Sequence, residues 1–331
     1  MEQLRKLFYL LLILPFLFVN TGCSSDDDNP VDPPVEVNQA EVLATALEAD
    51  GVLEDYPALI TAVDVNTAIL ASANIYVIDI RSTDVFNAGH IKDAVNVPDP
   101  SNVLQHYRDN NLETKETVVI ACYSGQTAAW ATGLLRAAGY TNVKDLKWGM
   151  CSWNAATSGS WTSQTNVNNG RATELVTTAT ARPAAGDLPT LNTGSTEAAG
   201  ILENRLSVVA AEGFGAAKVS SDEVFNNLSN YFILNYWSVD HYNWGHIPGA
   251  VQYTPKADIK LATALKTLPT DKPIAVYCYT GHTSAHVAAY LRALGYDAKS
   301  VLFGVNGMAH DTMPASKFDP ATQINDFPLF Q

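Results

Sequence analysis

Two stretches decide the fold: TVVIACYSGQTAAWATGLLRAAGY at residues 117–140 and PIAVYCYTGHTSAHVAAYLRALGY at residues 273–296. Each begins with a short apolar run, passes through a loop that starts with cysteine, and continues into an alanine-rich stretch that ends at a glycine. A short apolar, partly β-branched run predicts a buried strand, and an Ala- and Leu-rich stretch closed by Gly predicts a capped helix. Both stretches therefore predict the order strand, loop, helix.

The two stretches are parts of a longer internal repeat. The loop Cys122-Tyr123-Ser124-Gly125-Gln126-Thr127 recurs, at an offset of 156 residues, as Cys278-Tyr279-Thr280-Gly281-His282-Thr283. The turn Gly89-His90-Ile91 recurs at the same offset as Gly245-His246-Ile247. In a chain of 331 residues, this repeat predicts two homologous domains, at residues 40–158 and 200–331. Residues 159–199 are rich in Thr, Ser, Asn, Ala and Gly and predict an extended linker, of which Trp161 and Leu188 lie against a domain.

Strands and helices alternate within each copy. This alternation predicts an α/β fold with two domains, each a parallel sheet that carries helices on both faces. In such sheets ligands bind at the carboxyl ends of the strands. Cys122 and Cys278 each follow a predicted strand directly, so both are expected at that edge.

The two cysteine loops have a composition suited to holding an anion. Each loop contains a glycine and leads into a predicted helix, so its N–H groups can curl around the sulfur while the positive end of the helix points the same way. We therefore expect each loop to favour the thiolate, and to hold an anionic substrate or a charged sulfur intermediate. This combination points to covalent sulfur chemistry.

At the level of motifs, the chain resembles the rhodanese family of sulfurtransferases, as a tandem pair. The resemblance rests on Asp79-Ile80-Arg81, Gly89-His90-Ile91, Asn96-Val97-Pro98 and the cysteine loops. It implies that the loop cysteine takes a sulfane sulfur from thiosulfate or 3-mercaptopyruvate, becomes a persulfide, and passes the sulfur to cyanide or a thiol. The implied sulfur carriers are Cys122 and Cys278, and no cofactor or metal is implied. The implied substrate-binding residues are those that follow each cysteine: Tyr123, Ser124, Gly125, Gln126 and Thr127 in one loop, and Tyr279, Thr280, Gly281, His282 and Thr283 in the other.

The second copy departs from the first at one pair of positions. Asn235 and Trp237 replace Asp79 and Arg81, so the second copy lacks an ion pair that is expected to brace the first. We expect both cysteines to transfer sulfur, with different turnover, and to act independently because the two sites are far apart. Members of the family that are specialised for thiosulfate often use an Arg or Lys of the loop to bind the sulfonate. Neither loop contains Arg or Lys, so thiosulfate and 3-mercaptopyruvate both stay as alternative donors.

Several other conspicuous residues have simpler explanations. His90 and His246 are expected to make structural hydrogen bonds, and Cys151 to be a packed small residue. Trp148 and Met308 either wall the sulfur pocket or belong to the core. His282, which replaces Gln126, is expected to be variation on a solvent-facing loop.

Two other classes of function can be compared with the sulfurtransferase. A cysteine-dependent phosphatase needs an Arg after the loop to clamp phosphate, and Ala128 and Ser284 occupy that position. The alternative that stays open is a sulfur-carrier or persulfide-binding module of the cell envelope with weak turnover on small molecules.

The charge balance limits the partners. Lys and Arg number 20 against 34 Asp and Glu, a net charge of −14, so there is no basic excess to neutralise nucleic acid. The expected partners are a small sulfur donor and a thiol or cyanide acceptor, and a protein acceptor is also compatible with the sequence.

The first residues predict an envelope location. The apolar run at residues 7–19 follows Arg5 and Lys6 and is too short to span a bilayer, at about 20 Å of the ~30 Å core. It ends in Asn20-Thr21-Gly22-Cys23, which resembles a bacterial lipobox. We expect residues 1–22 to be a lipoprotein signal peptide, Cys23 to carry the lipid, and residues 23–39 to be an acidic, Pro-containing tether. The protein would then be attached to a membrane only through its lipid and face the periplasm or the cell exterior.

Overall fold

The structure is a computed structural model that describes residues 37–165 and 170–331. The predicted signal peptide, the lipobox with Cys23 and most of the predicted tether lie outside the described residues. Among the residues that are described, no helix is long and apolar enough to cross a membrane.

The first repeat is built on a five-stranded parallel sheet. Its spatial order is β1 (Leu59–Ile60), β5 (Val143–Leu146), β4 (Thr117–Ala121), β2 (Ile75–Asp79) and β3 (Val95–Asn96). Its helices are α2 (Gln39–Ala49), α3 (Ala62–Leu70), α4 (Thr83–Ala88), α5 (Val103–Asp109) and α6 (Gln126–Ala137).

The second repeat has the same architecture. Its parallel sheet has the order β6 (Lys218–Val219), β10 (Ala298–Val301), β9 (Ile274–Tyr277), β7 (Phe232–Tyr236) and β8 (Val251–Tyr253). Its helices are α8 (Ala198–Ala216), α9 (Ser221–Asn226), α10 (Val239–Trp244) and α11 (His282–Ala293), while α7 (Gly159–Thr165) follows the first repeat and α12 (Pro320–Gln323) lies near the end of the chain. The predicted α/β class, with two parallel sheets, is confirmed.

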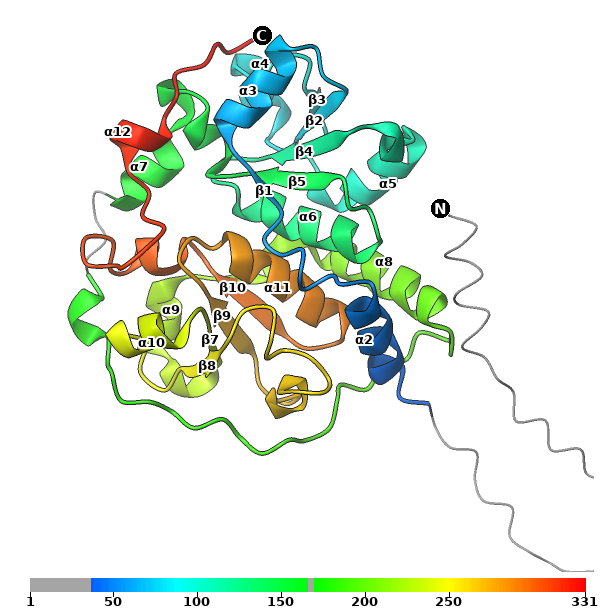
Figure 1. Ribbon diagram of the computed structural model, residues 1–331, viewed down its shortest axis with the longest axis vertical. Coiled ribbons are helices and arrows are strands. Elements are labelled where there is room, and N and C mark those ends of the chain that lie inside the picture. The colour runs from blue at the N-terminus through cyan, green and yellow to red at the C-terminus, as the bar shows by residue number, and fades with distance from the viewer. Residues whose placement is uncertain (1–36, 166–169) are drawn as a thin grey trace, which may run out of the picture. The chain divides into compact units, whose positions relative to one another are not determined.

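The two repeats meet along α6 and α11, which lie side by side (Figure 1). Both helices are buried over nearly their whole surface, as their alanine-rich sequences require. The backbones approach closely, because a Cβ added to Gly133 would lie 3.0 Å from the Cβ of Ala289. Gly133 and Ala289 are equivalent positions near the middle of the two helices, and Gly125, at the start of α6, contacts His282, at the start of α11. The helices therefore run in parallel and bring their N-termini, and the cysteine loops before them, to the same end of the interface.

The chain segment that follows each repeat forms a β-bridge with the other repeat. Val176, which follows the first repeat, forms an antiparallel bridge with His246 of the second, and Phe330, at the end of the second, forms the equivalent bridge with His90 of the first. Trp161 and Leu188 are buried, so the connection between the repeats lies partly against the domains, as its apolar residues predicted. These reciprocal bridges place both Gly-His-Ile turns under chain segments that are distant in sequence.

Candidate functional site: two cysteine loops at the repeat interface

The first cysteine loop cradles its sulfur with backbone N–H groups. Cys122 follows β4, and its Sγ accepts hydrogen bonds from the N–H groups of Gly125 at 3.1 Å and Ala128 at 3.4 Å. Gly125 has a φ of 89°, a left-handed conformation that lets the loop fold back over the sulfur before α6 begins. The side chain of Cys122 is buried, with only 3% of the residue exposed.

The second loop repeats this geometry and adds a hydroxyl group. Cys278 follows β9, and its Sγ accepts from the N–H groups of Gly281 at 3.3 Å and Ser284 at 3.4 Å. The Oγ of Ser284 lies 3.5 Å from the same sulfur and accepts its thiol proton. The equivalent position of the first loop is Ala128, which has no such group.

Burial outweighs the cradle at the first sulfur. It raises the pKa of Cys122 to about 11, although the N–H groups of Ala128 and Gly125 act in the opposite direction. The expectation that this loop favours the thiolate is therefore wrong for the arrangement seen here. The reason is that the sequence shows the hydrogen-bond donors of the loop but not the loss of water around the sulfur.

The remaining residues of the two loops form two groups, one exposed or partly exposed to solvent and the other buried. Tyr123 is exposed and Ser124, Thr127, Tyr279, Thr280 and Thr283 are partly exposed. Gly125, Gln126, Gly281 and His282 are buried at the interface between the repeats. The hydroxyl of Tyr123 accepts a hydrogen bond from the N–H of Ser82, which ties the first loop to the start of α4. The hydroxyl of Tyr279 makes the corresponding contact with the ring of His241 in α10.

The buried loop residues reach across the interface to the other repeat. Gln126 Oε1 accepts a hydrogen bond from the N–H of Phe303 at 2.6 Å, and His282 Nε2 accepts one from the N–H of Trp148 at 3.2 Å. A Cβ on Gly125 would lie 2.0 Å from the His282 ring, and a Cβ on Gly281 would lie 2.2 Å from Gln126. The two loops are therefore in direct contact, and the expectation that the two sites lie far apart is wrong.

His282 is the centre of a buried polar cluster that joins the repeats. Its Nδ1 donates to Oδ2 of Asp145 in β5 at 2.7 Å, and both side chains are fully buried. The second carboxylate oxygen of Asp145 lies 3.3 Å from Nε2 of His286 in α11. The expectation that His282 is solvent-facing variation is thus wrong. Its partners belong to the other repeat, so nothing in the local sequence of the loop reveals them.

The predicted brace of the first repeat is present. Asp79 and Arg81 form an ion pair at 2.6 Å, with each side chain 1% exposed, and Arg81 Nη2 also donates to the carbonyl of Gly89 at 2.8 Å. In the second repeat Trp237 is buried in place of the arginine and packs against the ring of Tyr279. An ion pair in one repeat is therefore replaced by aromatic packing in the other.

His90 and His246 make the structural hydrogen bonds expected of them. Nδ1 of each ring donates to a carbonyl in the preceding helix, that of Phe86 at 3.0 Å and that of Tyr242 at 2.8 Å. Each ring also stacks on the side chain of the same residue.

An aromatic cluster packs beside the first cysteine loop. Trp161 donates its indole N–H to the carbonyl of Ser124 at 2.9 Å and packs against Trp148, Phe303 and Phe318. Cys151 is fully buried in this cluster, and burial raises the pKa of its thiol, in agreement with a packing role. Sequence reasoning found Trp161 only as an apolar residue of the linker and missed Phe318 altogether.

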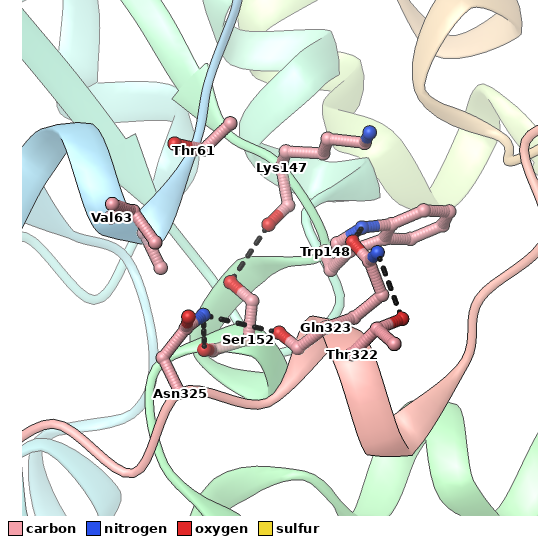
Figure 2. Close-up of a pocket in the computed structure, with 9 residues that line it drawn as sticks. Thr61, Val63, Lys147, Trp148, Ser152, Thr322, Gln323 and Asn325 are labelled. Atoms are coloured by element: carbon pink, nitrogen blue, oxygen red, sulfur yellow. Dashed lines mark hydrogen bonds between the residues drawn. The ribbon is translucent and has the colours of Figure 1, made fainter.

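Trp148 lies beside a cavity, whereas Met308 lies in a hydrophobic core. Trp148 lines a cavity of about 170 Å³ with Lys147 and Gln323, and its indole N–H donates to Gln323 Oε1 at 2.7 Å (Figure 2). Neither Cys122 nor Cys278 lines this cavity. Met308 is buried in the core of the second repeat, so packing explains it.

A family comparison agrees with this geometry. A model of the rhodanese-like domain matches the chain twice, at residues 62–156 and 226–309, and each match includes one cysteine loop. The chain belongs to the rhodanese-like domain family. Among the residues that the structure describes, no group of three or more His, Cys, Asp and Glu side chains is arranged to hold a metal ion.

Individual relatives match the rhodanese-like chain less completely. Rhodanese-like domain-containing protein 15, chloroplastic, of Arabidopsis thaliana is 32% identical over 98 residues, which are 25% of this chain and 51% of the relative. Senescence-associated protein DIN1 of Raphanus sativus matches with the same identity and coverage. The chain thus spans about half the length of the curated relatives it matches. A solved structure of thiosulfate sulfurtransferase from Pseudomonas aeruginosa is 15% identical, covers 88% of this chain and 48% of its own, and has a TM-score of 0.31.

Proposed function

We propose that the protein is a sulfurtransferase that moves a sulfane sulfur from thiosulfate or 3-mercaptopyruvate to a thiophilic acceptor, through a persulfide on Cys122 or Cys278. The observation that carries the proposal is the pair of backbone N–H groups that point at each sulfur from the start of a helix. Such a cradle stabilises the negative charge of a persulfide without any need for a basic side chain.

The reaction balances without a further reactant. With thiosulfate, the cysteine thiolate attacks the outer sulfur, a bond forms between Sγ and that sulfur, and sulfite leaves with the electron pair of the broken S–S bond. Cyanide then attacks the outer sulfur of the persulfide, thiocyanate leaves, and the thiolate returns. With 3-mercaptopyruvate, the C–S bond breaks instead and pyruvate leaves after taking a proton.

The burial of both cysteines controls whether a sulfur donor can reach them. Cys122 and Cys278 are 3% and 2% exposed, so a donor reaches either sulfur only after the loop or its cover moves. Tyr123 and Tyr279, on the outer side of the loops, are the residues we expect to move. A sulfur held in this way is also protected from unwanted oxidation between turnovers.

A phosphatase reaction fits the site poorly. A cysteine-dependent phosphatase places its phosphate-clamping arginine at the sixth position after the cysteine. Ala128 and Ser284 occupy that position here, and they contact the sulfurs through their backbone N–H groups. The one arginine of the neighbouring motif, Arg81, is fully used by Asp79 and the carbonyl of Gly89.

Persulfide formation tests the proposal directly. The full chain is incubated with thiosulfate or with 3-mercaptopyruvate, and intact mass is measured before and after cyanide is added. We expect a gain of one sulfur, about 32 Da, per active loop, which cyanide removes as thiocyanate. The Cys151→Ser variant, which changes a packed cysteine, serves as the control and should keep the gain. If the double variant Cys122→Ser, Cys278→Ser still gains cyanide-sensitive sulfur, the assignment of the sulfur carriers is wrong.

We further propose that the protein acts at a membrane surface in the cell envelope, attached through a lipid on Cys23. The support is the sequence alone: a short apolar run, Gly22-Cys23, and an acidic tether. Detergent partitioning and amino-terminal mass of the mature protein test this. Replacing Cys23 should release the protein from the membrane, and a mature chain that begins at another residue would contradict the proposal.

A further inference from the structure

A chain of buried hydroxyl groups leads to the sulfur of Cys278. Ser284 Oγ lies 3.5 Å from Cys278 Sγ and 2.8 Å from Ser300 Oγ, and Ser300 Oγ donates to the carbonyl of Gly281 at 3.3 Å. Ser284 and Ser300 are both completely buried. Since Ser300 gives its proton to a carbonyl, Ser284 donates to Ser300 and is left to accept from the thiol.

The first repeat has no counterpart of this chain. Ala128 stands at the position of Ser284, and Asp145, the third residue of β5, stands at the position of Ser300, the third residue of β10. Asp145 is held by His282 at 2.7 Å and lies 3.3 Å from His286, both in the second repeat. The Cys122 sulfur is therefore contacted by backbone N–H groups without a hydroxyl group.

We propose that Ser284 is a catalytic residue of the second sulfur site, where its hydroxyl donates a hydrogen bond to the anionic sulfur of Cys278, and that Ser300 positions it. This inference rests on the proposed sulfurtransferase function and makes Cys278 the more reactive of the two sulfurs. It also gives a specific cause for the difference in turnover that we expect between the two cysteines.

The physical basis is a reversal of hydrogen-bond direction. While the sulfur is a thiol, its weak S–H donor points to Ser284, and the hydroxyl protons point away from the sulfur toward Gly281. When the thiol proton is lost to solvent, Ser284 rotates its hydroxyl and donates to the sulfur, and this charge-assisted bond is stronger than the bond that it replaces. The same donor serves the persulfide anion. Ser300 provides the alternative acceptor, so that no buried hydroxyl is left unpaired in the thiol state.

The test compares Ser284→Ala with Ser284→Thr in the Cys122→Ser background of the full chain. Alanine is the residue that the first repeat carries at this position, so the fold accommodates it, whereas threonine keeps the hydroxyl. Two readouts are taken: the ultraviolet absorbance of the Cys278 thiolate at about pH 8, as the difference from the matching Cys278→Ser protein, and the rate of persulfide formation. Ser158→Ala removes a different buried serine, which donates to the carbonyl of Ala155 at 2.8 Å, and is the matched control.

We expect Ser284→Ala to reduce both the thiolate signal and the persulfide rate by about five-fold, the effect of one hydrogen bond of ordinary strength. Ser284→Thr should recover most of both, and Ser158→Ala should change neither. Equal signals in the alanine variant and its parent, or a threonine variant as poor as alanine, would overturn the proposal. If no protein in the set acquires sulfur, the proposed function fails, but the thiolate signal still decides the role of Ser284.

Discussion

His282 Nδ1 donates to Asp145 Oδ2 across 2.7 Å, and the two residues belong to different repeats. The N–H of Trp148 occupies the other ring nitrogen, so the proton of the imidazole is held on Nδ1 by two partners in the first repeat. His282 is also the fifth residue of the cysteine loop that begins at Cys278. The conformation of the second loop is therefore set by contacts with the first repeat.

Removing the carboxylate of this pair should destabilise the protein strongly. Asp145→Ala leaves the buried Nδ1–H of His282 without its acceptor, and we expect a loss of about 1–3 kcal/mol in the free energy of unfolding. Chemical denaturation measures this. The matched control is Glu203→Gln, which breaks the exposed pair with Arg108 and should cost less than about 1 kcal/mol. A similar, small effect of both substitutions would contradict the assigned role of Asp145.

The stability of the protein should fall in mild acid because of His286. Burial lowers the pKa of His286, while the nearby Asp145 acts in the opposite direction; His282 and Arg136 also face the ring electrostatically, and Tyr56 contacts it. With a native pKa below the unfolded value of about 6.5, the unfolded chain binds the proton more tightly. The contribution of His286 to the free energy of unfolding is then fully present above about pH 6.5, and it is lost as the pH falls toward the native pKa of His286. The melting temperature between neutral and mildly acidic pH measures this decline, and a smaller decline is expected in His286→Asn. An equal decline in both proteins would assign the effect to other groups.

Alkylation of Cys122 should be slow at neutral pH and should increase far into the alkaline range. With a pKa of about 11, its thiolate fraction rises about tenfold for each pH unit up to that value. The rate of modification by a small alkylating reagent in the Cys278→Ser protein, resolved by peptide mass, measures this. A free cysteine peptide provides the reference, since its rate levels off near pH 9. A plateau for Cys122 at the pH of the reference would show that the buried sulfur is more easily ionised than its surroundings imply.

The two sulfur sites should influence each other through Gln126. Its side chain packs on Gly281 of the second loop and accepts from the N–H of Phe303, so Gln126→Ala should change sulfur transfer at Cys278 although it lies in the other loop. Residues in contact commonly couple by 0.5–3 kcal/mol, which corresponds to a few-fold change in rate or more. Persulfide formation at Cys278, measured in the Cys122→Ser background with and without Gln126→Ala, tests this. Identical rates would restore the view that the two sites are independent.

The sequence by itself determined the repeated architecture. The offset of 156 residues, the apolar runs before Cys122 and Cys278 and the alanine-rich helices after them are local patterns, and they predicted two α/β domains with a cysteine at the end of a strand in each. The pairing of Asp79 with Arg81 was also predictable, because only Ile80 stands between them along the chain and their charges are opposite.

Only the tertiary structure decided what surrounds the two sulfurs. His282 and Asp145 are 137 positions apart, and Trp161 and Phe318 approach the first cysteine loop from the linker and the end of the chain. Burial depends on these long-range contacts, and it raised the pKa of Cys122 where the loop sequence alone favoured the thiolate. The hydroxyl chain at Cys278 has the same origin. Ser284 precedes Ser300 by 16 residues, and the sheet and helix of the second repeat bring the two hydroxyl groups together.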